Sequence, residues 1–275
     1  MRVRGRARRS QRASRRLREW RARRRVSQLD LSLSVGVSAR HLSFVESGRS
    51  RPSAELLLAL ADGLDIPLRE CNTLLLAAGH APRYPSRPLD DAALGPARDA
   101  VQRLLAAHDP YPGILIDRCW NIVATNSAAA ALTAGMPESL LGPPANVYRL
   151  CLHPDGLAAR TLNFGEWARY LLHQLRRTVA LTGDPALRSL DAEVRDYRGI
   201  ADLTTGQRAP NDNPPLLVPL VLDIGGGQRL SLFTTLTTFG TPRDVTLDEL
   251  AVELFYPADE SSAALLRDAT RGRSS

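Results

Sequence analysis

Between positions 28 and 47 the chain reads Gln28-Leu-Asp-Leu-Ser-Leu-Ser-Val-Gly-Val-Ser-Ala-Arg-His-Leu-Ser-Phe-Val-Glu-Ser47. Two short helices that cross steeply need a small residue where they touch, which Ser32 supplies. They also need a turn residue that accepts a positive φ, which Gly36 supplies. The packed positions must be apolar, and these are Leu31, Val35, Val37, Leu42 and Val45. Since Ser38 is placed to cap the second helix, the stretch predicts a helix-turn-helix whose second helix enters the major groove of DNA. An ordinary pair of packed helices is the alternative.

Residues 13–80 around this motif are predicted to form an all-α domain of five short helices. One helix spans about 14–24 before the motif, one spans 54–64 after the capping residue Ser53, and one ends near Ala78, before Gly79. A Pro-rich linker follows at residues 81–95, since three prolines between Ala81 and Pro88 favour an extended connector.

The positive charge of the chain is concentrated at its N-terminus. The formal net charge is +7, and residues 1–25 contain 13 arginines against one acid, Glu19. Residues 26–80 (4 Arg, 6 acids) and 81–275 (19 Arg, 22 acids) are slightly acidic. We expect residues 1–12 to form a basic arm that binds a polyanion, of which nucleic acid is the usual one. A tail without function and a mis-set start codon are the alternatives.

The composition excludes several classes of function. All 36 basic residues of the 275 are arginine, so the chain has no P-loop lysine, Schiff-base lysine or Ser–Lys dyad. Cys71, Cys119 and Cys151 form no C-x-x-C motif, and no apolar run reaches the roughly 18 residues of a membrane span. No histidine is spaced for metal binding, the nearness of Cys151 and His153 being a weak signal alone. We expect a cytoplasmic non-enzyme without catalytic residues, metal, cofactor or membrane contact.

Residues 96–270 differ in sequence pattern from the helical residues 13–80, and they predict an α+β domain around an antiparallel sheet. Strand-like runs occur near its start and its end, with helical segments between them. Glycines 225–227 join two of the runs as in a hairpin. The predicted strands lie in 113–125, 215–224, 229–239 and 250–256, and the predicted helices in 96–108, 127–133, 164–182, 185–198 and 257–268.

The stretches Val26–Leu31, Val35–Ser38 and Glu46–Ser53 resemble the Cro/repressor (XRE) class of helix-turn-helix regulators. The longer string Arg40–Ser53 resembles the MmyB-like regulators of high-GC bacteria. The second domain is similar to the MmyB-like ligand-binding domain at residues 125–130, 163–167, 239–245 and 253–259. The resemblance covers about 13–270. It implies a bacterial transcription regulator whose PAS-like C-terminal domain binds a small apolar molecule, with a fatty acid as one candidate.

The resemblance also implies which residues meet DNA. The groove-facing residues are Ser38, Ala39, Arg40, Ser43, Phe44 and Ser47, and those placed for phosphates are Gln28, Arg49, Ser50 and Arg51. Arg40 is the strongest base reader, because a guanidinium grips guanine O6 and N7 together, and a phosphate clamp is its alternative. Phe44 either meets a thymine methyl or packs into the core. Ala39 departs from the class, in which a polar base reader is frequent at this position, so DNA shape and the arm must contribute to specificity.

For the second domain we expect a mostly apolar ligand site with a few polar anchors. Helical spacing places Trp167, Tyr170, Leu171 and Leu175 on one face. We expect this face to line a pocket against Phe233, Leu232 or Leu236. The candidate polar anchors are Asn126, Arg149 and His153. Ordinary core packing is the alternative for this face. The rival function for the domain is dimerisation or protein contact without a ligand.

Leu29 and Leu33 occupy positions of the first motif helix that are usually polar. Because an exposed pair of leucines favours contact with another apolar surface, we hypothesise that they dock on the second domain or a second subunit. Packing under the arm and the first helix is the alternative. We expect a homodimer on a pseudo-palindromic operator with half-sites about 34 Å apart.

Overall fold

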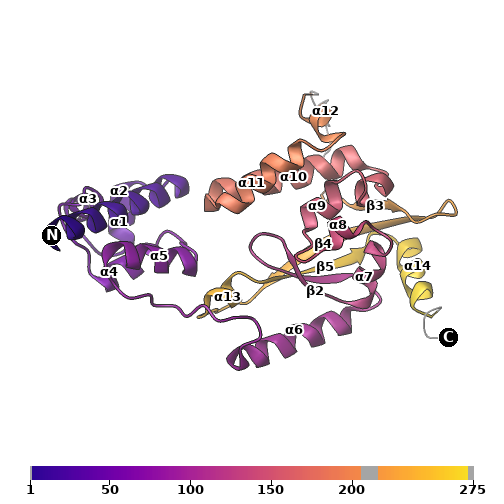
Figure 1. Ribbon diagram of the computed structural model, residues 1–275, viewed down its shortest axis with the longest axis horizontal. Helices are drawn as coiled ribbons and strands as arrows, with labels where there is room; N and C mark the ends of the chain where they lie inside the picture. The colour runs from indigo at the N-terminus through magenta and orange to yellow at the C-terminus, as the bar shows by residue number, and fades with distance from the viewer. Residues whose placement is uncertain (1, 206–215, 272–275) are drawn as a thin grey trace. The chain divides into compact units, whose positions relative to one another are not determined.

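The computed structural model describes residues 2–205 and 216–271 (Figure 1). The chain divides into two compact units, one made of residues 1–91 with 240–248 and one of residues 92–239 with 249–275. Residues 240–248 lie inside the second domain that the sequence predicts, but their tertiary contacts assign them to the first unit.

The first unit is helical, as predicted. Its helices are α1 (Arg2–Arg24), α2 (Gln28–Ser34), α3 (Ala39–Glu46), α4 (Ala54–Asp62), α5 (Leu68–Ala78) and the short α13 (Val245–Asp248). Ser27, Ser38 and Ser53 cap α2, α3 and α4, each accepting a hydrogen bond from a backbone N–H three residues on. Gly36 has a φ of +71°, as the turn requires. The core gathers Leu17, Trp20, Leu31, Leu42, Val45, Leu57, Leu60, Leu74 and Leu75.

The N-terminal segment differs from the expectation of an arm. The predicted helix begins near Ser14, whereas α1 begins at Arg2, so the backbone of residues 2–12 continues the helix. Six of the eleven residues are arginine, which has a high helix propensity, and Gly5 is the weakest helix former of the segment.

The second unit has the expected α+β architecture. Five strands form an antiparallel sheet in the order β2-β1-β5-β4-β3. The strands are β1 (Gly113–Ile116), β2 (Ile122–Thr125), β3 (Leu220–Asp223), β4 (Arg229–Thr238) and β5 (Ala251–Pro257). The helices are η1 (Ala92–Leu94), α6 (Gly95–His108), α7 (Ser127–Thr133), α8 (Glu138–Leu141), α9 (Val147–Leu152), η2 (Leu157–Arg160), α10 (Phe164–Thr182), α11 (Pro185–Arg195), α12 (Ile200–Thr205) and α14 (Glu260–Arg271). The predicted strand 215–224 is thus shorter, and residue 215 lies outside the described residues.

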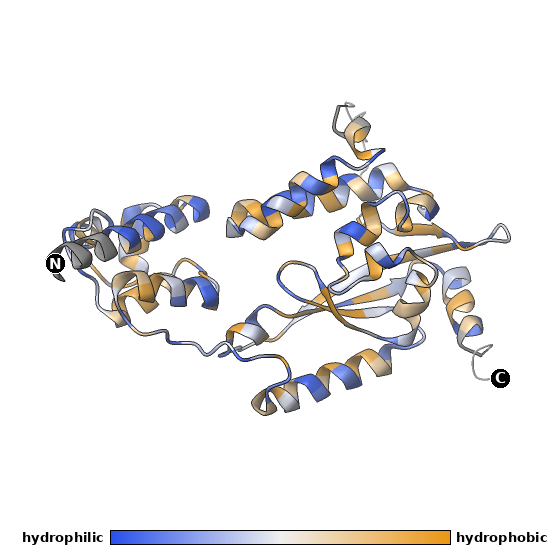
Figure 2. Ribbon diagram, viewed as in Figure 1, coloured by the Kyte–Doolittle hydropathy of each residue, from blue (hydrophilic) through white to orange (hydrophobic). Residues whose placement is uncertain are grey.

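Helices cover both faces of this sheet. Figure 1 shows α6 along one face and α9, α10 and α11 beyond the other. Side chains alternate across a strand, so Phe255 joins the core of α9 and α10, whereas Leu254 points toward Leu105 of α6. Figure 2 shows that the strands are largely apolar and that the helices have mixed faces, as expected where helices pack on a sheet. The end of β4, residues 235–238, is exposed.

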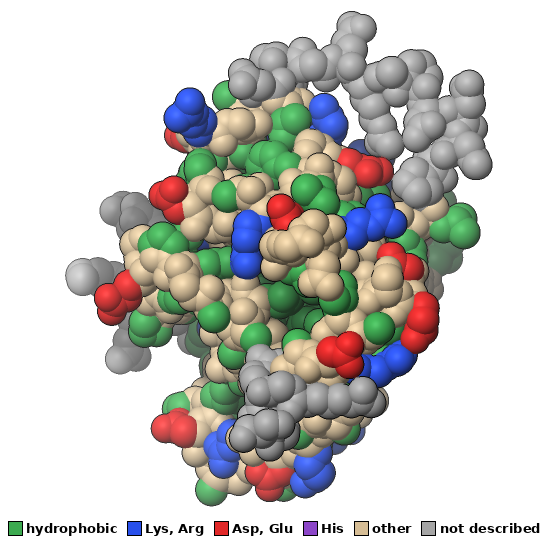
Figure 3. Space-filling view, turned by 90° about the vertical axis from the view of Figure 1, so that its right-hand side faces the viewer, with side chains coloured by type: hydrophobic (Ala, Val, Ile, Leu, Met, Phe, Trp, Pro, Cys, Tyr) green, Lys and Arg blue, Asp and Glu red, His purple; other side chains and the backbone are tan. Residues whose placement is uncertain are grey.

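The surface of the molecule carries both signs of charge. Figure 3 shows basic and acidic side chains scattered among hydrophobic ones on the face in view, without a large area of one sign. Such a surface agrees with the nearly balanced charge of residues 81–275. By sequence count, the excess of positive charge belongs to the N-terminal 25 residues.

Candidate nucleic-acid interface and effector pocket

The outer face of α3 presents the predicted DNA-reading side chains. Leu42 and Val45 are buried in the core and orient the helix. Arg40 and Ser47 are exposed on the other side, and Ala39, Ser43 and Phe44 are half-buried. Ser38 begins the helix, its Oγ accepting from His41 N at 3.1 Å. The structure therefore brings the predicted groove-facing residues together on one helical face.

An aromatic ring with two arginines marks the centre of this face. The guanidinium carbon of Arg40 lies 5.4 Å from the centre of the Phe44 ring, and that of Arg49 lies 5.9 Å from it. These are cation–π distances. Phe44 is half-buried and does not belong to the buried core cluster, so its contact with a thymine methyl stays a prediction. Neither guanidinium has an acidic partner among the residues that the structure describes, so both charges are available to a polyanion.

The loop after α3 holds the predicted phosphate-contact residues. The backbone N–H groups of Arg49 and Ser50 donate to Phe44 O at 2.9 and 3.0 Å, and Gly48 has a φ of +74°. Arg51 is exposed, with Nη2 donating to Gly79 O at 3.3 Å. The loop geometry is therefore fixed by its backbone, while the arginine side chains lie at the surface.

Glu46 is a buried residue that the sequence analysis overlooked. Its carboxylate accepts from Arg21 at 2.6 and 2.9 Å and from Gln28 Nε2 at 2.6 Å, and its backbone carbonyl accepts from Arg18 at 2.8 Å. Burial opposes ionisation of Glu46, but the hydrogen bonds from Arg21 and Gln28 outweigh it and lower its pKa. This network ties α1, α2 and α3 together, and it engages one N–H of the Gln28 amide, for which we expected a phosphate contact.

Leu29 and Leu33 are 58% and 70% exposed. They do not pack under α1, which was the alternative to docking on a partner. The docking hypothesis itself stays a prediction.

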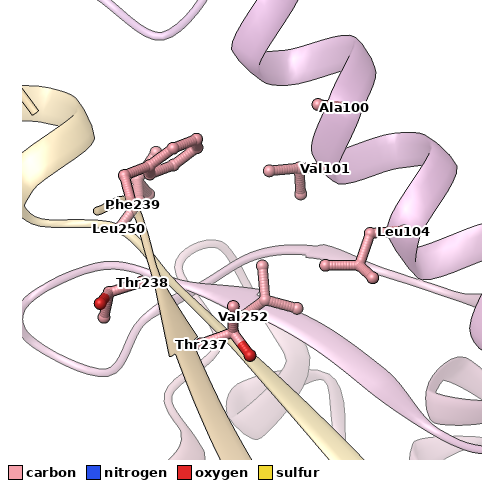
Figure 4. Close-up of a pocket in the computed structure, with 8 residues that line it drawn as sticks. All are labelled: Ala100, Val101, Leu104, Thr237, Thr238, Phe239, Leu250 and Val252. Atoms are coloured by element: carbon pink, nitrogen blue, oxygen red, sulfur yellow. The ribbon is translucent and has the colours of Figure 1, made fainter. Parts of the chain in front are cut away.

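An apolar cavity of about 150 Å³ opens between α6 and the adjoining ends of β4 and β5 (Figure 4). Its lining residues are Ala100, Val101, Leu104, Thr237, Thr238, Phe239, Leu250 and Val252. Figure 4 shows Val101 and Leu104 projecting from α6 toward the strand ends that carry Val252 and Phe239. The two threonines bring the only hydroxyls of this lining, so the cavity suits an apolar occupant.

The opposite face of the sheet buries polar atoms without partners. Tyr148 Oη, Trp167 Nε1 and Glu253 Oε2 have no hydrogen-bond partner within the described residues. Burial raises the pKa of Glu253 to about 7. Burial also raises the pKa of Tyr148, with a further contribution from the charge of Glu253. The core of this unit thus holds a carboxyl group whose neutral form is favoured.

The comparisons with known families agree with this geometry. Residues 17–71 match the family described as Helix-turn-helix, and residues 97–269 match the MmyB-like transcription regulator ligand binding domain, which spans more than half of the chain. The chain belongs to the MmyB-like transcription regulators. The resemblance seen in the sequence is confirmed, and the protein is a DNA-binding transcription regulator with a ligand-binding domain. No curated protein is significantly similar to the chain.

The matched families are regulator and ligand-binding families rather than enzyme families. The three cysteines are free thiols. Within residues 2–205 and 216–271, no helix is long and apolar enough to cross a membrane, and no group of three or more His, Cys, Asp or Glu side chains is placed to hold a metal ion.

In this MmyB-like regulator the predicted anchor Asn126 serves the fold. Its Oδ1 accepts from the backbone N–H groups of Gly113 and Ala129, both at 3.0 Å. Its Nδ2 donates to Tyr111 O at 2.7 Å and to Leu105 O at 3.2 Å. With these four bonds the amide has no capacity left for a ligand. Asn126 caps α7 and joins it to α6 and β1.

The other two predicted polar anchors, Arg149 and His153, also contact residues of their own domain. Arg149 binds Glu193 through two hydrogen bonds of 2.7 Å, and Tyr197 donates to the same carboxylate at 2.6 Å. The hydrogen bond from Arg149 lowers the pKa of Glu193, although burial opposes it. His153 lies edge-on to Tyr197 with ring centres 4.9 Å apart. Arg149 therefore pairs within the domain, which leaves it poorly suited to bind the carboxylate of a ligand.

The helical face that we expect to line a pocket is only partly brought together with the hairpin. Trp167 and Leu171 are buried against the sheet, and Tyr170 stacks on Trp167 with ring centres 5.5 Å apart. Phe233 stacks instead on Tyr256, which contacts His108 of α6. Since successive strand residues face opposite sides, Phe233 points away from Trp167, and its neighbour Leu232 joins that core. The structure therefore places Leu232, and not Phe233, on the side of the sheet that faces Trp167.

Proposed function

We propose that this MmyB-like regulator binds a pseudo-palindromic DNA operator as a homodimer in the bacterial cytoplasm, with Arg40 as its principal base reader. The observation that carries the proposal is the Arg40–Phe44–Arg49 cluster on the outer face of α3. A recognition helix reads bases with side chains that are exposed and held in place, and this cluster meets both needs. In this proposal Arg40 grips a guanine, while the Phe44 ring meets a thymine methyl.

The remaining predicted residues complete the interface. Ser38, Ala39, Ser43 and Ser47 border the reading face, and Arg49, Ser50 and Arg51 lie in the loop placed for phosphates. We propose that the arginine-rich first half of α1 adds phosphate or minor-groove contacts beside the operator. Gln28 contributes by orienting α2 through Glu46.

We further propose that the ligand-binding domain senses a small apolar effector, with a fatty-acid-like molecule as one candidate. Its family supports a ligand-binding role, and the apolar cavity beside α6 supports an effector that is apolar and small. The rival candidate is a domain that only dimerises or contacts a protein, and the engagement of Asn126 and Arg149 within the fold supports that reading.

Operator selection from a random DNA library, followed by native mass spectrometry of the purified protein with and without the selected duplex, tests the proposal. We expect one enriched palindromic sequence and a complex of two chains per duplex. A library that shows no enrichment would overturn sequence-specific binding, and one chain per duplex would overturn the dimer. An apolar molecule released on denaturing extraction at one per chain would support the sensor, and an empty dimer would favour the rival.

A further inference from the structure

The segment of residues 240–248, which joins β4 to β5, is built into the first unit. Val245 is buried, and its backbone N–H donates to Pro85 O at 2.8 Å. Asp244 is also buried and accepts from Arg87 Nη1 at 2.8 Å, while the Thr246 hydroxyl donates to Arg87 O. Two hydrogen bonds and an ion pair therefore hold this segment on residues 85–87.

The same segment supplies the cap of α5. The residue before this helix is Pro67, which forms no side-chain capping bond. Asp248 Oδ2 instead accepts from the backbone N–H of Leu68 at 3.0 Å, from 180 positions away in the sequence. A helix start leaves N–H groups without partners and favours a nearby negative charge. The first turn of α5 consequently depends on where residues 240–248 lie.

The apolar cavity borders this segment on both sides of the sequence. Thr237, Thr238 and Phe239 precede it, and Leu250 and Val252 follow it. An occupant therefore contacts the chain where it leaves β4 and where it enters β5. The cavity is open on one side, since Ala100, Leu104, Thr237 and Thr238 are exposed. Its volume of about 150 Å³ is below the 300–1,000 Å³ usual for drug-sized ligands, and it suits a molecule about the size of one aromatic ring.

We propose that this cavity is an effector site for an apolar molecule about the size of one aromatic ring, and that residues 240–248 transmit its occupancy to α5. The inference rests on the proposed function, which it supplies with a site, a ligand size and a route. An occupant that contacts Phe239 and Leu250 selects one placement of the segment, and hence of Asp248. Helix α5 packs on α1, and α1 packs on the recognition helix α3, so the effect reaches the reading face through packed helices.

The first experiment tests the site, with benzene as the probe and methyl NMR of Val101, Leu104 and Val252 as the readout. Ala100→Phe adds a ring from an exposed position that lines the cavity, whereas Ala106→Phe adds the same ring at an exposed position of α6 outside it. We expect saturable shifts in the wild type and in Ala106→Phe, and none in Ala100→Phe. Equal binding by Ala100→Phe, or none by the wild type, would overturn the site. A cavity found covered by a second copy of the chain would also overturn it.

The second experiment tests the route without DNA, by hydrogen exchange of the Leu68 amide. We expect benzene to change its exchange rate by about fivefold, which is within the usual range of couplings between sites. Asp248→Ala should bind benzene but lose this response, and Asp248→Asn should keep it because the amide oxygen still accepts. A full response in Asp248→Ala would overturn the route.

Affinity for the selected operator is then measured with and without benzene. A change of about fivefold that disappears in Ala100→Phe supports the whole proposal. If Leu68 responds and the operator affinity does not, the site and the route stand, and effector control of DNA binding is overturned.

Discussion

Glu46 in the first unit and Glu253 in the second are both buried, with 2% and 7% of their surface exposed. Their titration behaviour is nevertheless opposite. Burial disfavours the charge of each, but Glu46 gains hydrogen bonds from Arg21 and Gln28 that lower its pKa, whereas the pKa of Glu253 rises to about 7. The partner, and not burial, decides which form of a buried carboxyl the fold stabilises. The first unit thus uses buried charge to join helices, and the second holds a carboxyl that is easily neutralised.

Breaking the Glu46 pair has the largest expected effect. Arg21→Ala leaves Glu46 charged, buried and without its main partner, which should lower the free energy of unfolding by about 3–5 kcal/mol. Urea denaturation, monitored by circular dichroism, measures this loss of unfolding free energy. Arg15→Ala is the control, since Arg15 and Glu19 form an exposed pair, and we expect a change below about 0.5 kcal/mol. Equal losses of unfolding free energy in the two variants would show that the buried Glu46 network stabilises the fold no more than an exposed ion pair does.

Replacing Glu253 tests the other half of the comparison. Its folded-state pKa of about 7 lies above the ordinary 4.5, so the folded state holds this proton more tightly than the unfolded state. The stabilising contribution is therefore complete below about pH 4.5 and is lost as pH rises through 7. Glu253→Gln cannot ionise and should exceed the wild type by about 3 kcal/mol in unfolding free energy at pH 8, with little difference at pH 4. Parallel stability curves from pH 4 to 8 would contradict the assignment.

The comparison extends to two arginines. Arg40 has no acidic partner among the described residues, whereas Arg149 pairs with Glu193. Arg40→Ala should weaken binding to the selected operator by about 1–3 kcal/mol and relax one base position. Fluorescence anisotropy with the operator and with a scrambled duplex measures both effects. Arg176→Ala removes an exposed arginine of α10 and serves as the charge control. An equal loss on the scrambled duplex would make Arg40 a phosphate contact.

Shortening α1 has the smallest expected effect. Deletion of residues 1–9 removes five arginines and leaves Gln11, which lies near Gly48, in place. We expect the slope of log affinity against log salt to flatten by about 0.9 for each phosphate that the shortened protein no longer neutralises. An unchanged slope, measured on the operator between low and moderate salt, would show that these arginines do not contact DNA.

Local rules account for the parts of the fold that the sequence predicts. Ser27, Ser38 and Ser53 cap helices because a serine side chain reaches an N–H three residues on, and Gly36 turns the chain because it accepts a positive φ. Helical periodicity predicts which side of α3 is exposed, and the resemblance to the XRE class implies which of its residues meet DNA. These interactions span a few residues, so the sequence determined the helix-turn-helix and its exposed face.

The rest depends on residues that are distant in the chain. Arg149 and Glu193 are 44 positions apart, and Asp248 caps Leu68 from 180 positions away. The face occupied by Phe233 depends on strand register, where a shift of one residue exchanges the two sides of a sheet. Residue type does not encode which distant partner a side chain meets. Only the tertiary structure decided that Arg149 pairs internally, that Glu253 is buried without a cation, and that residues 240–248 join the DNA-binding unit.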